Sequence, residues 1–95
     1  MGTMSKERYI HSDITAEILS IAFEVHNIIG SGFVESVYQK AMLVECGIRA
    51  VQADSEIELP VYYKNIKVGS RRADLLIKKK VIVELKAVAE LNDTH

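Results

Sequence analysis

The sequence has few of the residues with which small proteins form disulfide bonds or structural metal sites. Its 95 residues include one cysteine, one proline and no tryptophan, and the lone Cys46 has no partner within the chain. An intramolecular disulfide and a cysteine-rich zinc site are therefore excluded, and a reducing compartment is favoured. The chain also lacks the run of about 18 apolar residues that a membrane span needs, and it lacks a signal-peptide pattern. These absences predict a cytoplasmic protein that does not enter a membrane.

The composition is that of a folded domain. Hydrophobic residues make up 48% of the chain and charged residues 26%, with no low-complexity tract. This balance is typical of globular rather than disordered proteins. The length allows one hydrophobic core and no second one, so residues 1–95 are expected to form a single domain.

Charge is unevenly distributed along the chain. Residues 1–63 contain four Lys/Arg against nine Asp/Glu, whereas residues 64–86 contain eight against two. The positive segment indicates an anionic partner. Part of that charge is the block Lys78–Lys80, and such blocks more often form a solvated turn.

The first half of the sequence predicts two helices. Between residues 14 and 29, apolar side chains recur every three or four positions, which is typical of an amphipathic helix. Ser12 or Asp13 can cap its start and Gly30 can end it. The same spacing over residues 34–44 predicts a second helix that stops at Gly47.

The second half predicts three strands, which gives the order α-α-β-β-β. Residues 48–63 and 66–77 are rich in β-branched and aromatic side chains, and Lys64-Asn65 between them suits a two-residue hairpin turn. Pro60 has no N–H for a sheet ladder, so its strand is expected at an edge. Residues 81–88, "VIVELKAV", are mostly apolar and predict a third strand at the centre of the sheet.

Three charged side chains in the last two strands can converge. If Lys78–Lys80 forms a three-residue loop, Asp74 lies opposite Glu84, and Lys86 shares their face. Two facing carboxylates repel each other and favour a bound cation such as Mg²⁺. A two-residue turn would instead place Asp74 opposite Val83 and separate the carboxylates. A solvated face with weak ion pairs is the other open interpretation.

Two motifs resemble a known family. "GFVESVY" contains Gly32, Glu35 and Tyr38 in the spacing that names the GxxExxY proteins, and Asp74 followed by Glu84-Leu85-Lys86 resembles the D-x(n)-E-x-K signature of the PD-(D/E)XK nuclease superfamily. The resemblance implies the α/β class and a restriction-endonuclease-like core, with an α+β appearance in this chain. It also implies a metal-dependent nuclease, either an endonuclease or an exonuclease, acting on nucleic acid.

The resemblance assigns roles to individual residues. It implies that Asp74, Glu84 and the backbone carbonyl of Leu85 bind Mg²⁺ or Mn²⁺ and that Lys86 assists the attacking water. Glu35 would be a further catalytic acid from the preceding helix. Capping of that helix is an alternative role for its carboxylate.

Four more residues are candidates near the site. Arg72 lies on the face of Asp74, and Arg71 and Arg72 could bind phosphate beside the metal, because guanidinium groups pair well with phosphate oxygens. Plain solvent exposure is the alternative for Arg71. Tyr38 and His26 could reach the rim of the site, but both lie at apolar helical positions where core packing is the simpler expectation.

The resemblance implies another helix and at least one more strand after the E-x-K strand. The sequence ends at residues 92–95, where that helix is expected to begin. The domain is therefore expected to be incomplete at its C-terminus and to leave a strand edge open, which favours self-association. The alternative function is a non-catalytic module that binds nucleic acid or a protein.

Overall fold

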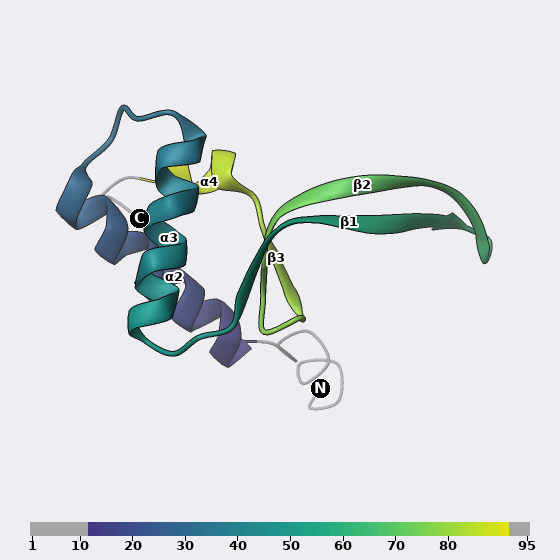
Figure 1. Ribbon diagram of the computed structural model, residues 1–95, viewed down its shortest axis with the longest axis horizontal. Helices are drawn as coiled ribbons and strands as arrows, with labels where there is room; N and C mark the ends of the chain where they lie inside the picture. Colours follow the sequence, from purple (N-terminus) through teal and green to yellow (C-terminus); the bar gives the residue numbers. More distant parts are fainter. Residues whose placement is uncertain (1–11, 92–95) are drawn as a thin grey trace, which may run out of the picture.

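The computed structural model describes residues 12–91, which form an α+β arrangement (Figure 1). The helices gather at one end of the molecule, and a long two-stranded ribbon leaves them at the other end (Figure 1). The predicted order of two helices followed by three antiparallel strands is confirmed. The elements are α2 (Ser12–Ile29), α3 (Glu35–Ile48), β1 (Ala53–Tyr63), β2 (Ile66–Ile77), β3 (Val81–Val83) and α4 (Leu85–Ala89).

Helix α2 forms as its apolar spacing predicts. Its side chains at three- and four-residue intervals are buried, and Asp13 accepts a hydrogen bond from the Ile14 N–H at 2.9 Å. The helix ends at Gly30, whose φ of 83° lies in the left-handed region. The Gly30 N–H returns to the His26 carbonyl at 2.8 Å. This is the glycine-terminated helix end expected from the sequence.

A short loop joins α2 to α3, and the side chain of Tyr38 closes it. The Tyr38 hydroxyl donates to the Gly30 carbonyl at 2.8 Å and accepts from the Phe33 N–H at 3.3 Å. Gly32 has a φ of 97°, which a residue with a Cβ rarely adopts. The spacing of Gly32 and Tyr38 therefore has a local structural purpose, because the glycine turns the chain and the tyrosine one turn into α3 holds it.

The β1–β2 hairpin turns where the sequence indicates. Lys64 and Asn65 have φ values of 49° and 68°, so both adopt the left-handed conformation that a tight hairpin turn of type I′ requires. Pro60 lies in β1, which is an edge strand of the sheet order β1-β2-β3. The predicted edge position of this proline is confirmed.

The third strand is shorter than predicted and differently placed. The three-residue loop is confirmed, since Ile77 pairs with Val81 and Leu75 with Val83. The prediction of a central strand over residues 81–88 is wrong, because β3 ends at Val83 on the sheet edge and α4 follows. Leu85 and Val88 are both buried. A strand would send these two side chains to opposite faces, whereas a helix puts both on the face that packs into the core.

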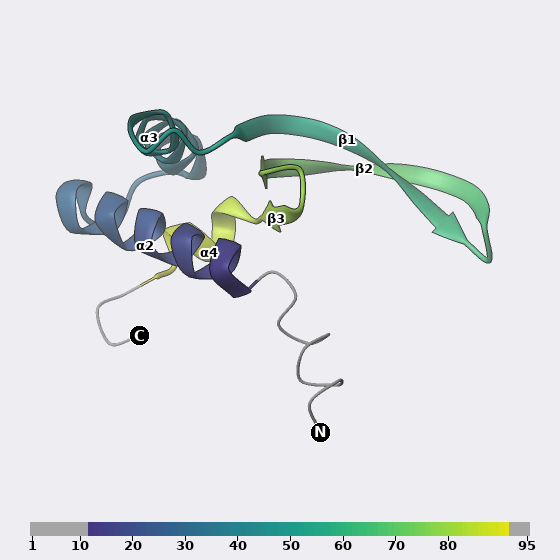
Figure 2. The ribbon, with the colours of Figure 1, turned by 90° about the horizontal axis from the view of Figure 1, so that it is seen from below.

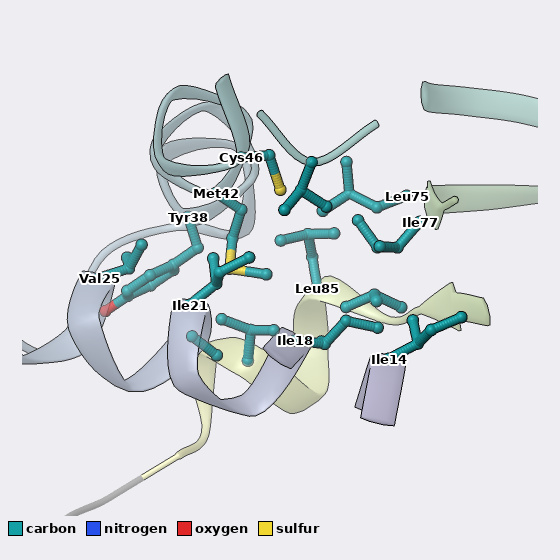
Figure 3. Packing of buried hydrophobic residues seen from close by; sticks show 14 residues of the cluster. Ile14, Ile18, Ile21, Val25, Tyr38, Met42, Cys46, Leu75, Ile77 and Leu85 are labelled. Atoms are coloured by element: carbon teal, nitrogen blue, oxygen red, sulfur yellow. The ribbon is translucent and has the colours of Figure 1, made fainter. Parts of the chain in front are cut away.

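The core lies where the two long helices, α4 and the near end of the sheet meet (Figure 3). Tyr38, Met42 and Cys46 project from α3 toward the isoleucines of α2 and toward Leu75. Burial raises the pKa of the Cys46 thiol above its ordinary value of 9.0. Among residues 12–91, no helix combines the length and apolar character needed to cross a bilayer.

Candidate functional site

A small open pocket lies where the start of α3 meets β2. It has a volume of about 210 Å³. At about 30 Å³ per water molecule, it can hold several waters or a phosphate group. Its lining comes from four elements, with Glu35, Ser36 and Gln39 from α3, Glu56 from β1, Arg72 and Asp74 from β2, and Leu85 from α4.

Asp74 is the most firmly positioned acid of the pocket. Its side chain is half-buried, and Oδ2 accepts a hydrogen bond from the Leu85 N–H at 3.0 Å. The Gln39 side-chain amide donates to the Asp74 backbone carbonyl at 3.2 Å. Leu85 is the first residue of α4, so its N–H has no partner within that helix. A carboxylate offers about four acceptor sites, and the Asp74 carboxylate retains capacity for a further ligand.

Glu35 is the first residue of α3 and the only acidic side chain in its first turn. It projects beside the helix start because the preceding loop is held by Tyr38. Val34, the N-cap residue, makes no side-chain capping hydrogen bond. The unpaired N–H groups of the first turn attract negative charge. Glu35 therefore lies in the pocket in a position that also suits the helix dipole.

Glu56 and Arg72 complete the pocket from the two long strands. Arg72 Nη1 lies 3.9 Å from Glu56 Oε1, and both side chains are exposed. Glu56 has a φ of 54°, an uncommon value for a residue with a side chain. Glu56, Gln39 and Ser36 line the pocket without having been predicted from the sequence. Pairing of Ser55 with Leu75 and of Ile57 with Ala73 places Glu56 level with Asp74, and no local pattern carries that information.

The pocket is rich in acids. Glu35, Glu56 and Asp74 face one guanidinium group, that of Arg72. Carboxylate oxygens are the ligands that hard divalent cations prefer, so this donor set fits Mg²⁺ or Mn²⁺ chemically. The carboxylates of the pocket do not, however, converge on a single cation position. Across residues 12–91, no three His, Cys, Asp or Glu side chains come together closely enough to hold a metal ion.

Glu84 is next to the pocket and points elsewhere. Its Oε2 accepts from Arg71 Nη2 at 2.8 Å, and the two side chains are 49% (Arg71) and 58% (Glu84) exposed. Glu84 lines a separate apolar groove between α2, β3 and α4. Its backbone remains extended, with φ −91° and ψ 121°. Because Leu75 pairs with Val83, Asp74 and Glu84 are the next two opposed positions of the register.

Lys86 and the Leu85 carbonyl are not where an extended third strand would place them. Lys86 is exposed on α4, and Leu85 directs its N–H toward Asp74. The structure thus brings Asp74, Glu35, Arg72 and Leu85 to one pocket. Arg71, Glu84 and Lys86 are not among its lining residues.

Tyr38 and His26 belong to the packing of the helices. Tyr38 is 0% exposed, and its ring stacks on the His26 ring with centroids 5.0 Å apart. A ring nitrogen of His26 bonds to the Val88 carbonyl and so ties α2 to α4. Neither residue lines the pocket. Their positions support the acidic site indirectly, because they hold the helix start that carries Glu35.

The chain was compared with known proteins. Residues 12–95 match the family model described as the PD-(D/E)XK nuclease superfamily. The comparison with curated proteins and the comparison with solved structures each gave no match. The matched range covers every element of the fold and all the residues of the pocket.

Proposed function

The chain belongs to the PD-(D/E)XK nuclease superfamily, and on this premise we propose that it is a metal-dependent nuclease of the GxxExxY type with its reaction centre at the α3–β2 pocket. One observation carries the proposal. Glu35 of the Gly-x-x-Glu-x-x-Tyr motif and Asp74 of the D-x(n)-E-x-K motif are far apart in the sequence and line the same opening. The two motifs thus contribute to one site.

A divalent cation, Mg²⁺ or Mn²⁺, would polarise a phosphoryl oxygen and lower the pKa of a bound water. Asp74 and Glu35, which line the pocket, are the residues best placed to hold it. Glu84 would join them from outside the pocket once it is released from Arg71. Three acids against one guanidinium make the pocket negative, so a phosphate group approaches it favourably only after a cation has offset that charge.

Glu84 is available to this site despite its ion pair with Arg71. An exposed ion pair is worth only about 0–1 kcal/mol, and this one is exposed on both sides. When a phosphodiester binds beside Arg71, the guanidinium exchanges one oxyanion partner for another. The freed Glu84 carboxylate would then be able to turn toward Asp74, its neighbour in the register.

The remaining candidates bind or orient the substrate. Arg72 lies in the pocket and would bind a non-bridging phosphate oxygen through its guanidinium fork. Lys86 would orient the attacking water and stabilise developing negative charge. Lys86 and the Leu85 carbonyl reach the reacting group only if the chain after Val83 extends along β2 in place of α4.

One observation favours a second function. Within residues 12–91 the acids are not closed around a cation position, and Glu84 is engaged by Arg71. Such an arrangement suits a non-catalytic module that binds nucleic acid or protein and uses the acidic pocket structurally. Within the described residues, β3 pairs only with Leu75, Leu76 and Ile77 of β2. The edge of β2 opposite β1 is therefore unpaired over residues 66–74 and offers such a module a route to self-association.

Calorimetric titration with Mn²⁺ separates the two functions. Asp74→Asn is the decisive variant, because the amide oxygen can still accept the Leu85 N–H while the charge is lost. We expect wild type to bind Mn²⁺, Asp74→Asn and Glu35→Gln to lose that binding, and Glu58→Gln, an exposed acid of β1 outside the pocket, to retain it. Cleavage of nucleic acid should require Mn²⁺ or Mg²⁺ and the Asp74 carboxylate. Retention of Mn²⁺ binding and cleavage by Asp74→Asn would contradict the proposal.

A further inference from the structure

The β1–β2 hairpin projects well beyond the core. Figures 1 and 2 show the ribbon leaving the helices and twisting along its length. Every residue from Val61 to Arg72 is exposed. We call residues 57–72 the arm. An isolated two-stranded ribbon is marginally stable in water, and so long an exposed ribbon implies a partner surface along which it lies.

The two faces of the arm differ. Paired residues share a face, and successive residues alternate. Glu58 pairs with Arg72, Pro60 with Ser70 and, after a bulge between Val61 and Tyr62, Tyr62 with Lys67. These residues form the face that carries Arg72 and Asp74, and we call it the pocket face. The opposite face carries Arg71, which pairs with Leu59, and otherwise mainly apolar side chains, namely Ile57, Leu59, Val61, Tyr63 and Ile66.

The pocket face has the chemistry of a phosphate-binding surface. Arg72 and Lys67 supply positive charge on this face, and Glu58 is its one acid within the arm. Tyr62 and Ser70 supply hydroxyl groups, the latter donating to Glu58 at 3.3 Å, and Arg72 lies 3.9 Å from Glu56. These contacts are exposed, so phosphate oxygens can replace the two carboxylates. Over the whole arm, four Lys/Arg stand against a single acid, Glu58. At the tip, the Lys64 ammonium lies 5.4 Å from the centre of the Tyr63 ring. The arm as a whole therefore carries a net positive charge and complements an anionic partner.

The dimensions of the arm agree with those of a DNA groove. Glu56 and Lys64 lie eight residue steps apart on β1, a span of about 26 Å at ~3.3 Å per step. This length corresponds to roughly 8 base pairs at ~3.4 Å each, and the ~12 Å major groove of B-DNA admits a two-stranded ribbon. The deep, narrow major groove of A-form RNA does not. The geometry therefore favours duplex DNA over duplex RNA.

We propose that the arm lies in the major groove of duplex DNA with its pocket face toward the bases and backbone, so that a phosphodiester at the root of the arm meets the α3–β2 pocket. This inference rests on the proposed nuclease function and specifies its substrate. Pairing of two arms from two copies is disfavoured, because each arm carries a net positive charge that would repel the other.

The test is binding of a fluorescein-labelled DNA duplex of mixed sequence and about 24 base pairs, three times the estimated span. Fluorescence anisotropy in EDTA measures binding without cleavage, and a salt series from about 50 to 200 mM gives the slope of log Kobs. Two matched pairs of variants locate the surface. Tyr62→Ala and Tyr63→Ala remove rings that are 61% and 62% exposed on opposite faces. Lys67→Ala removes a cation of the arm, and Lys80→Ala removes one from the loop at the other end of β2.

We expect Tyr62→Ala to weaken duplex binding at least tenfold and Tyr63→Ala to change it less than twofold. Lys67→Ala should lower the magnitude of the salt slope by about 0.9, the contribution of one phosphate contact, and Lys80→Ala should leave it unchanged. An unlabelled RNA duplex of the same sequence should compete poorly. Far-UV circular dichroism should show all four variants folded, because the substituted side chains are exposed.

Three results would overturn the inference. These are unaltered binding in Tyr62→Ala and Lys67→Ala, equal competition by duplex RNA, or a concentration-dependent dimer that Tyr63→Ala dissociates. The outcome is separate from that of the nuclease proposal. DNA binding through the arm without metal-dependent cleavage would support the DNA-binding role of the arm and contradict the nuclease proposal. Metal-dependent cleavage that the arm variants leave unaffected would support the nuclease proposal and contradict the role of the arm.

Discussion

Replacement of Tyr38 by phenylalanine tests whether the loop before α3 is held by one hydroxyl group. The side chain is 0% exposed, and its oxygen bonds to the Gly30 carbonyl at 2.8 Å and to the Phe33 N–H at 3.3 Å. A hydrogen bond contributes about 0.5–1.5 kcal/mol net, and more is lost when a buried group is left unpaired. Gly30 is half-buried and Phe33 is exposed, so water can replace part of the loss. We expect unfolding free energy to fall by about 1–2 kcal/mol.

Urea denaturation followed by circular dichroism measures this change, with Tyr63→Phe as the control because its side chain is 62% exposed. The control midpoint should not move. Since the loop places Glu35 in the pocket, Tyr38→Phe should also weaken Mn²⁺ binding severalfold. This loss of affinity should exceed what the small unfolded fraction of the variant in the absence of urea can account for. Equal urea midpoints for wild type and Tyr38→Phe would refute the assignment of Tyr38 as the residue that closes this loop.

Three other substitutions give distinct outcomes. Gly32→Ala should lower the unfolding free energy by about 1–2 kcal/mol in urea denaturation, because its φ of 97° strains a residue with a Cβ while no atom lies within 4 Å of that Cβ. Gly47→Ala should instead raise the unfolding free energy by up to about 1 kcal/mol, because Gly47 lies inside α3 and alanine has the higher helix propensity. Burial raises the folded pKa of the Cys46 thiol, so stability is intact below pH 9.0 and declines as pH rises above it, and Cys46→Ala should remove that decline in pH-dependent melting curves. Arg71→Ala should change stability by less than about 1 kcal/mol and tighten Mn²⁺ binding in calorimetry, because it releases Glu84; weaker Mn²⁺ binding would contradict that role.

Much of the fold follows from short-range patterns. The spacing of apolar residues located α2 and α3, and Gly30 marked the end of the first helix. Lys64-Asn65 identified the hairpin turn, and Pro60 identified an edge strand. Each of these features depends on backbone conformation or on neighbours a few residues away. Local sequence therefore carries enough information to predict them.

The candidate site was predictable only in part. Motif spacing indicated Glu35 and Asp74, which do line one pocket, and Arg72, which joins them. Glu56 enters that pocket through the pairing of β1 with β2. Pairing joins residues distant in the chain, so no local pattern marks Glu56 as a member of the site.

The sequence by itself determined the two long helices and the hairpin turn, and it left two registers open for the turn at Lys78–Lys80. The pairing of Ile77 with Val81 in the folded sheet selects the three-residue loop that makes Asp74 and Glu84 neighbours. Only the tertiary structure decided the conformation after Val83. The segment from Leu85 to Ala89 is short and apolar enough to suit a strand or a helix, and intrinsic propensity decides weakly over five residues. The helix forms because it alone buries both Leu85 and Val88 against the core, and this burial leaves Glu84 beside Arg71.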